Sequence, residues 1–411
     1  VRRRAGGGRS AAMSRRIRIG GVDVAFDSEP PAKLLADAFT RREHPLCMCC
    51  PEGVPMYIAR FGNRHILKRM PDTGPQHDVD CDSYEPPAGL SGLASVEGAA
   101  IVENIEDGTT SLKLGFSLSK LAGRAAPVTG ESAEAGEART AGTRLSLKAT
   151  LHFLWDRAGF NRWRPAMAGR RNWAVLRKFL LDAAAASTAK GKPLAHSLYI
   201  PEMFDAKREE AIARRRAEVL SRALQASGNR RSLAILIGEV KEIAPSRIGA
   251  RMVVKHAPRF PFMLADDVAR RMKKSFANEL ALWDANAEWH LVAVATFGIG
   301  PAGIATIEAI AVMTVNENWI PVETGYEAML VERLTRNGAS FVKSLRYNLP
   351  TAQPMASLVR AREGGQSMAM YLIPDDADPA WRTTLRELID ESGMQCWVWD
   401  IAAGPMPDLP S

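Results

Sequence analysis

The sequence reads HPLCMCC at residues 44–50 and YIARFGNRHILKRMPDTGPQHDVDC at residues 57–81, and these two stretches decide how the N-terminal part folds. They hold four of the five cysteines within 35 residues, and Cys396 stands alone. An odd, clustered set of cysteines favours metal binding in a reducing compartment over a disulfide framework. We therefore expect a metal site and a cytoplasmic protein.

The ligand types and their spacing indicate zinc. Zinc prefers four thiolate or imidazole ligands at the corners of a tetrahedron. Cys47 and Cys49 form a C-x-C knuckle, and His77 and Cys81 form an H-x3-C pair whose i, i+4 spacing predicts one face of a helical turn. A hairpin of strands 56–59 and 65–68 should bring the pairs together. Four protein ligands leave no open position for a substrate, so we predict one structural zinc ion.

Other interpretations of this cluster stay open. Cys50 is a spare thiol or an alternative ligand, and His44 and His65 are weaker candidates. An iron–sulfur cluster is less favoured than zinc. In the simplest alternative, these residues are reduced, half-buried cysteines and a surface histidine.

Length and composition describe an ordinary globular chain. The 411 residues are enough for two or three domains. No run of eighteen apolar residues occurs, so we expect no membrane span. The net charge of +8 is concentrated in two patches: residues 1–22 hold seven arginines and no acid, and residues 144–178 hold nine Lys or Arg and one Asp. Local basic patches are typical of nucleic-acid contact surfaces.

The second patch interleaves cations with tryptophans. Guanidinium groups pair with phosphates and indoles stack on bases, so we predict contact with nucleic acid, most naturally DNA. Two helices in this segment suggest a helix that enters the major groove, although the turn between them is longer than in a standard helix-turn-helix. The alternative is that the tryptophans are core and the arginines a solvated rim. The predicted contact residues are Arg157, Arg162, Arg164, Arg170, Arg171, Arg177 and Lys178.

The predicted organisation is an α+β, multi-domain chain. A disordered basic tail (1–20) precedes a small, β-rich, metal-stapled unit (21–121) and a flexible linker (122–143). A basic helical segment (144–228) follows, with helices near 147–158, from Asn172 onward and from Pro201 to Ala223. Residues 229–411 are predicted to form a mixed α/β domain, in which residues 265–285 form a helix.

From about residue 320 the predicted order of elements is α-β-β-β-α-β, which resembles the core of the PD-(D/E)XK, or restriction-endonuclease-like, fold. Active members place an acid on the second strand and an E-x-K motif on the third, because carboxylates must hold Mg²⁺ beside the scissile phosphate. Here Met355 stands where the aspartate is expected, and the third strand has neither Glu nor Lys. Glu323, Glu327 and Lys343 remain as candidate relics. We therefore predict no catalytic residue and no nuclease activity.

A second resemblance covers nearly the whole chain. The two cysteine stretches, GFNRWRPAMAGRRNW at 159–173 and WIPVETGYE at 319–327 resemble the bacterial domain-of-unknown-function family number 1173. That resemblance implies N-terminal cysteines, supports Cys47, Cys49 and Cys81 as a set, and implies no assigned activity. Its members often lie near mobile-element genes, which agrees with DNA binding only by association.

The favoured function is a zinc-containing, DNA-binding or DNA-processing accessory protein with an inactive nuclease-like domain. The alternatives are an active metal-dependent nuclease and a protein–protein adaptor whose basic segment binds an acidic partner. His152, His196, His256 and His290 are scattered in the sequence, and each is interpreted as structural. Cys396, in an apolar terminal strand, is expected to be buried.

Overall fold

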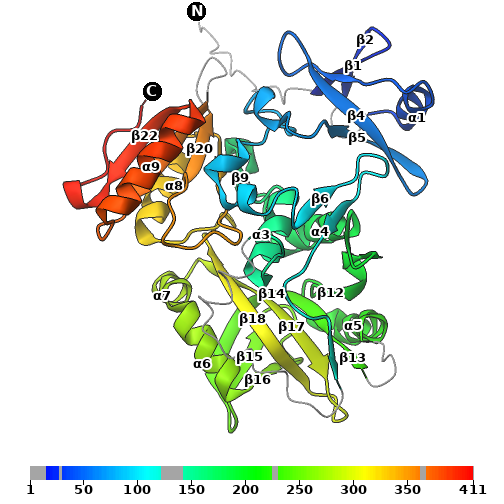
Figure 1. The fold of residues 1–411 in the computed structure, drawn as a ribbon. Coiled ribbons are helices and arrows are strands. Elements are labelled where there is room, and N and C mark those ends of the chain that lie inside the picture. Colours follow the sequence, from blue (N-terminus) through cyan, green and yellow to red (C-terminus); the bar gives the residue numbers. More distant parts are fainter. Residues whose placement is uncertain (1–14, 27–29, 122–141, 225–229, 362–366, 411) are drawn as a thin grey trace, which may run out of the picture. The chain divides into compact units, whose positions relative to one another are not determined.

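The computed structural model describes residues 15–26, 30–121, 142–224, 230–361 and 367–410 (Figure 1). The chain divides into two compact units. The first extends to Glu85 and includes Asn104–Gly108, and the second comprises Pro86–Glu103 and the chain from Thr109 onward. The second unit thus includes most of residues 86–121. It also includes the helical segment 144–228 and the domain 229–411, which were predicted to be separate. The predicted linker 122–143 lies outside the described residues, apart from its last two.

The first unit is built on one antiparallel sheet. The strand order is β2-β1-β3-β4-β5. Its elements are β1 (Arg15–Ile19), β2 (Val22–Phe26), α1 (Ala32–Thr40), β3 (Leu46–Cys47), β4 (Val54–Phe61) and β5 (Arg64–Arg69). The β4–β5 hairpin agrees with the sequence prediction, and Gly62 at its turn has a φ of +59°.

β1 corrects the predicted disordered tail, because residues 15–19 form a paired strand. Ile17 and Ile19 are buried and alternate with arginines, and both pack with Leu35 and Ala38 of α1. Ile17 also pairs in register with Cys47. The strand therefore supports one of the predicted metal ligands.

The second unit contains a large sheet whose pairings close on themselves. The order β12-β14-β15-β16-β18-β17 is completed by pairing of β14 with β17. Along β17, Leu291, Ala293 and Ala295 belong to one hydrophobic cluster, whereas Val292 and Val294 belong to another, so the strand is buried on both faces. The strands are β12 (Leu198–Tyr199), β14 (Ala234–Pro245), β15 (Ala250–Val254), β16 (Phe262–Leu264), β17 (His290–Ile299) and β18 (Ala305–Val315).

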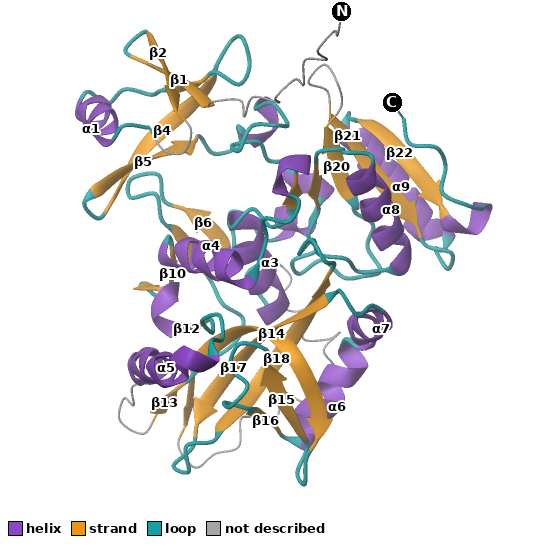
Figure 2. Ribbon diagram, turned by 180° about the vertical axis from the view of Figure 1, so that it is seen from behind, coloured by secondary structure: helices purple, strands orange, loops and turns teal. Residues whose placement is uncertain are grey.

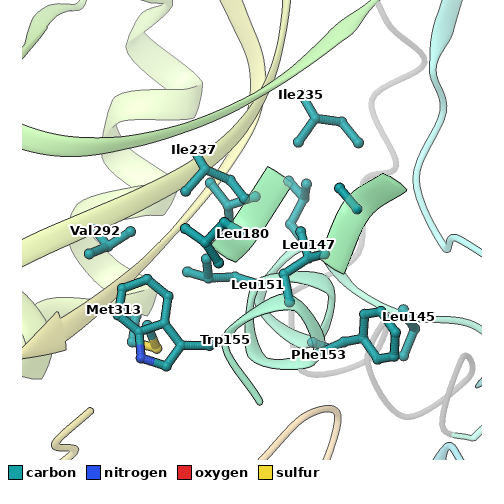
Figure 3. Close-up of a cluster of buried hydrophobic side chains, with 14 of the residues drawn as sticks. Leu145, Leu147, Leu151, Phe153, Trp155, Leu180, Ile235, Ile237, Val292 and Met313 are labelled. Atoms are coloured by element: carbon teal, nitrogen blue, oxygen red, sulfur yellow. The ribbon is translucent and has the colours of Figure 1, made fainter. Parts of the chain in front are cut away.

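Helices cover this sheet. α3 (Leu147–Arg157) and α4 (Trp173–Ala185) pack on one face, where Leu151 and Trp155 meet Ile237, Val292 and Met313 (Figure 3). The side chain of Asn172 accepts a hydrogen bond from the Val175 amide, as a helix N-cap does. The sheet is also contacted by α5 (Glu209–Ala223), α6 (Asp266–Ser275) and α7 (Ala277–Ala285).

Two helix predictions differ from the structure. α5 begins at Glu209, later than Pro201, because the chain is still in the sheet at Tyr199, which ends β12, and residues 201–205 then form a loop. The helix predicted over 265–285 is interrupted at Phe276, which divides it into α6 and α7. No helix among the described residues has both the length and the apolar character needed to cross a membrane.

The C-terminal part of the second unit forms another sheet, which is covered by two helices. Its elements are α8 (Gly325–Arg336), β19 (Phe341–Lys343), β20 (Leu358–Ala361), β21 (Ser367–Ile373), α9 (Pro379–Ser392) and β22 (Gln395–Asp400). They follow the predicted order, in a sheet β22-β21-β20-β19-β9 whose last strand is β9 (Arg162–Trp163). α8 and α9 lie on opposite faces of this sheet (Figures 1 and 2). The likeness to the restriction-endonuclease fold stays a prediction.

Both edge strands of this sheet, β9 and β22, differ from the sequence prediction. β9 lies within the segment predicted to be helical, and it pairs with β19. Cys396 is exposed and not buried, because β22 is an edge strand that presents alternate residues outward.

Candidate metal centre

Two short segments of the first unit supply the four predicted ligands. Cys47 ends β3, and Cys49 lies in the turn that leads to β4. His77 directly follows the 3₁₀ helix Gly74–Gln76, and Cys81 closes a turn in which its amide donates to the Asp78 carbonyl. The β4–β5 hairpin connects the two segments and returns the chain to β3. The backbone at His77 is extended, so the predicted helical turn over 77–81 is replaced by a β-turn.

The four ligand atoms converge. The Sγ atoms of Cys47, Cys49 and Cys81 and the imidazole of His77 all lie within 4.8 Å of one another. Cys47 Sγ is 3.7 Å from Cys81 Sγ, and His77 Nδ1 is 3.4 Å from Cys49 Sγ and 3.8 Å from Cys81 Sγ. A tetrahedron with Zn–S bonds of about 2.3 Å and Zn–N bonds of about 2.0–2.1 Å has S···S edges of about 3.8 Å and S···N edges of about 3.6 Å. The observed separations fit a single ion of that size.

The protonation of the sulfur atoms also favours a cation. The hydrogen bond with Cys49 lowers the pKa of Cys47, but the bond with Cys81 and burial outweigh it and raise that pKa to about 11. Hydrogen bonds with Cys47 and Cys81 raise the pKa of Cys49, whereas bonds from Cys47 and Cys49 lower the pKa of Cys81. The three sulfur atoms thus compete for protons, because a negative charge on one disfavours a negative charge on the others. Three thiolates can coexist here when a cation replaces the shared protons.

Backbone amides support the sulfur atoms. The amide of Asp78 donates to Cys49 Sγ and the amide of Ser83 donates to Cys81 Sγ, each at 3.4 Å. Such donors stabilise thiolate charge. His77 is buried and directs Nδ1 at the sulfurs, while its Nε2 has no hydrogen-bond partner among the described residues. Nδ1 is therefore the atom of His77 that is placed to contact an ion at this site.

The weaker ligand candidates lie outside the group. Cys50 Sγ is 3.8 Å from Cys49 Sγ and 3.5 Å from the Gln76 carbonyl oxygen, but it does not belong to the four converging atoms. His65 packs against Phe39 with the two rings tilted, and His44 is also outside the group. Among the described residues, no second group of His, Cys, Asp and Glu side chains has the geometry to hold a metal ion.

The predicted nucleic-acid contacts differ in exposure, and some of them have partners within the protein. Arg157 pairs with Glu103 at 2.7 Å, and Arg177 Nε donates to the Ile200 carbonyl at 3.0 Å. Arg162 and Arg164 are half-buried, whereas Arg170 and Lys178 are exposed. Trp155, Trp163 and Trp173 are all buried in the hydrophobic core.

Arg171 is an internal structural contact. Its guanidinium donates to the carbonyls of Phe160 at 3.0 Å and Asn318 at 3.1 Å, and also to those of Gly159 and Arg162. Burial lowers the pKa of Arg171 to about 10. This side chain therefore ties the loop between α3 and α4 to the segment before α8.

Sequence reasoning missed a constellation around the buried Glu239 on β14. Its carboxylate accepts hydrogen bonds from His290 Nδ1 at 2.8 Å and Lys255 Nζ at 2.9 Å, and His256 Nε2 lies at 3.4 Å. The imidazole of His290 stacks on Trp319 and that of His256 stacks on Trp173. Only the pairing of β14 with β15 and β17 brings these distant residues together, and the sequence carries no local signal of it.

The candidate nuclease relics also come together. Lys343 Nζ is 2.9 Å from Glu327 Oε1, and Arg346 Nε is 2.8 Å from Glu323 Oε2. Each carboxylate is thus paired with a cation, and neither belongs to a group able to hold a metal ion among the described residues.

Comparison with known proteins gives one match. No curated protein and no solved structure matches the chain. A family model described as a protein of unknown function (DUF1173) matches residues 17–402. That range takes in the four converging ligands and almost all of both units. The chain therefore belongs to the DUF1173 family.

Proposed function

We propose that the first unit binds one zinc ion through Cys47, Cys49, His77 and Cys81, and that this ion is structural. The observation that carries the proposal is the convergence of four ligand atoms within 4.8 Å, at separations that suit one tetrahedral cation. Thiolates and imidazole are the ligands that zinc favours. Because all four positions belong to the protein, the ion has no open coordination site for catalysis.

The ion joins the segment that contains Cys47 and Cys49 to the segment that contains His77 and Cys81, because few buried apolar contacts surround these side chains. Around the four side chains, the buried members of the hydrophobic cluster among the described residues are Cys47, Val54 and Met56. A small cluster of this kind gives limited stability, so metal binding supplies folding free energy. We expect the first unit to lose its structure when the ion is removed.

Elemental analysis of the untagged protein, as purified, tests this proposal. We expect about one zinc per chain, and less than about 0.2 in Cys81→Ser, because a three-ligand site loses most of its affinity. Cys50→Ser is the matched control, since its thiol is adjacent but outside the group. A wild-type protein without zinc, or equal zinc in Cys81→Ser and wild type, would overturn the proposal.

We propose DNA binding as a second function, which makes the protein a DNA-binding or DNA-processing accessory protein. The supporting observation is that Arg170, just before α4, and Lys178, in its second turn, are exposed, and that α4 has no acid in its first turn. Lys178 also lies 3.7 Å from Asp182 of the same helix, and both side chains are exposed. A helix start without acids and with a cation nearby favours phosphate. We infer no strand cleavage, because β20 and β21 carry no carboxylate and Glu323 and Glu327 are paired with cations.

The DNA proposal is tested by fluorescence anisotropy with a labelled duplex. We expect affinity to fall steeply with added salt and to drop about tenfold in the double variant Arg170→Ala, Lys178→Ala. Lys192→Ala, an exposed lysine on β11 (Lys192–Pro193), is the control for general charge loss. Unmeasurable affinity at about 50 mM salt would refute binding. Plasmid nicking with Mn²⁺ would refute the accessory role.

A further inference from the structure

Five strands of the large sheet in the second unit form a closed barrel. β14 pairs with β15, β15 with β16, β16 with β18, β18 with β17, and β17 again with β14. The β16–β18 pair is parallel, and the other four pairs are antiparallel. In chain order the neighbours run 1-2-3-5-4-1, and α6 and α7 lie between the third and fourth strands. This connectivity is that of the oligonucleotide/oligosaccharide-binding barrel, or OB-fold.

β14 closes the barrel because it bends. Its N-terminal half pairs with β17, and its C-terminal half pairs with β15. A register shift between Val240 and Glu242 marks a bulge close to this change of partner, and bulges bend strands. The interior of the barrel is filled by side chains such as Met252, Phe262 and Phe297. A ligand of this barrel must therefore bind on its outer wall.

One side of the outer wall is covered and another is open. α3 and α4 bury the side that contains Ile237 and Val292 (Figure 3). On the other side, Arg251, Met263 and Thr306 pair across the neighbouring strands β15, β16 and β18. The residues before and after each of them are buried in the barrel, so these three side chains point outward. Arg251 is exposed and the other two are half-buried, and we call this row the open row.

Two hairpin turns border the open row. The β14–β15 turn carries Ile248 and the β17–β18 turn carries Ile304, and these side chains are 65% and 53% exposed. The first residue of β16 pairs with Ala305, next to Ile304, whereas its last residue pairs with Ala250, two residues after Ile248. The turns therefore lie at opposite ends of the row. In OB barrels, these two loops and the face of the second and third strands form the binding surface.

α6 adds positive charge beside this surface. The β14–β15 turn packs against the start of α6, since Gly249 leaves no room for a Cβ next to the Leu264 carbonyl oxygen. Residues 241–251 and 266–275 carry seven cations and three acids, and all of these side chains are exposed. The cations are Lys241, Arg247, Arg251, Arg270, Arg271, Lys273 and Lys274.

The acids of these two segments do not neutralise the cations. Glu242 lies 3.2 Å from Arg251, and Asp267 lies 2.8 Å from Arg271. All four side chains are about half exposed, so these pairs are weak and each arginine can turn to a phosphate. Asp266 is the third acid, and the other cations outnumber it. The surface therefore complements a polyanion.

Among polyanions, a single strand of nucleic acid fits this combination of groups best. Its unstacked bases offer flat apolar faces next to charged phosphates. Ile248 and Ile304 can contact bases, and arginine can stack on a base or pair with a phosphate. A duplex keeps its bases inside, so it would leave both isoleucines in water. An acidic peptide would pair with the cations but would bring no repeated flat face.

We propose that the open row, bordered by Ile248 and Ile304, binds single-stranded DNA, with Arg247 and Arg251 at its phosphates. The choice of DNA over RNA rests on the proposed DNA function. The surface itself goes beyond that function, because it shares no residue with the contact proposed at α4. It is also independent of the zinc proposal, since all its residues belong to the second unit.

Fluorescence anisotropy of the full chain with a labelled oligothymidine tests this proposal. A length of about 15 nucleotides suffices, because one OB barrel covers about 4–16 nucleotides. The variant Arg247→Ala, Ile248→Ser removes one cation and one apolar contact from an exposed turn, where substitutions have little effect on folding. The matched control is Met329→Ser, Arg336→Ala on α8, which also removes an exposed apolar side chain and an exposed arginine.

We expect the wild type and the control to bind the single strand more tightly than a duplex of the same length. Binding of the single strand should weaken about tenfold in Arg247→Ala, Ile248→Ser and about threefold in Ile304→Ser, at an unchanged unfolding temperature. The proposal is overturned if the wild type does not bind the single strand at about 50 mM salt, or if the turn variant binds like the control.

Competition identifies the kind of ligand. Unlabelled oligothymidine should displace the probe, whereas a duplex or polyglutamate at equal charge should displace it less well. Equal displacement by either competitor would also overturn the proposal, because the surface would then recognise charge alone. Duplex binding without single-strand binding would refute only this inference, and single-strand binding without duplex binding would refute only the contact proposed at α4.

Discussion

Lys343 Nζ lies 2.9 Å from Glu327 Oε1, and both side chains are almost fully buried. Lys343 comes from the end of β19 and Glu327 from the first turn of α8, so the contact fixes the helix to the sheet. Burial raises the pKa of Glu327, and the charge of Lys343 offsets this only in part. Burial of this ion pair costs desolvation free energy, and the folded state tolerates it only when both charges are present.

Removing one partner should destabilise the protein strongly. We expect Lys343→Met to lower the free energy of unfolding by about 3–5 kcal/mol, because a buried carboxylate loses its cation. The double variant Lys343→Met, Glu327→Leu should recover most of this loss, since no buried charge remains. Urea unfolding measures both. A loss below about 1 kcal/mol in the single variant would show that the pair contributes little.

The buried carboxylate of Glu239 should make stability depend on pH. Burial raises the pKa of Glu239, but hydrogen bonds from His256, His290 and Lys255 outweigh it and hold the pKa well below its ordinary value of 4.5. A depressed pKa in the folded state contributes stability above the ordinary pKa, and this contribution is lost as pH falls below it. Glu239→Gln should flatten the decline in unfolding free energy between about pH 5 and pH 3.

Glu242→Gln provides the control for that experiment. Glu242 lies on the same strand and pairs with Arg251, but its side chain is about half exposed. Its replacement should leave the acid limb of the stability curve nearly unchanged, because exposed pairs contribute little. If Glu239→Gln and Glu242→Gln gave the same curve as the wild type, the constellation around Glu239 would have no role in acid stability.

Arg171 should be intolerant of lysine. Its guanidinium reaches several carbonyls at once, including those of Phe160 and Asn318, and the single ammonium of lysine cannot reproduce this fork. We expect Arg171→Lys to cost about 2–4 kcal/mol of unfolding free energy. The neighbouring exposed Arg170→Lys should stay within about 0.5 kcal/mol of the wild type. Equal stability of the two variants in urea would argue against the structural role.

Short-range patterns in the sequence predicted much of the architecture. The convergence of Cys47, Cys49, His77 and Cys81 was predictable because the spacings are short and the hairpin between them has a clear turn at Gly62. The Asn172 cap and the order of elements after residue 320 were likewise visible, because capping and strand periodicity are local. β1 also has a local signal in the sequence, because Ile17 and Ile19 alternate with arginines at the period of a strand.

Features that depend on strand register or on burial were not predictable. Glu239 meets His290 because Glu239 pairs opposite Val292, and nothing in the sequence specifies that register. Arg171 and Arg170 are neighbours with the same chemistry, yet one is internal and the other exposed. The sequence gives no indication that one of these arginines is buried, so both were included among the predicted nucleic-acid contacts.

Zinc K-edge X-ray absorption on the purified full chain tests the central claim most directly, because it reports the ligand atoms around the ion. The account predicts a four-coordinate shell of three sulfur atoms at about 2.3 Å and one nitrogen at about 2.0–2.1 Å. In Cys81→Ser that carries residual metal, one sulfur should be lost. A shell made only of oxygen and nitrogen atoms, or a spectrum unchanged by Cys81→Ser, would contradict it.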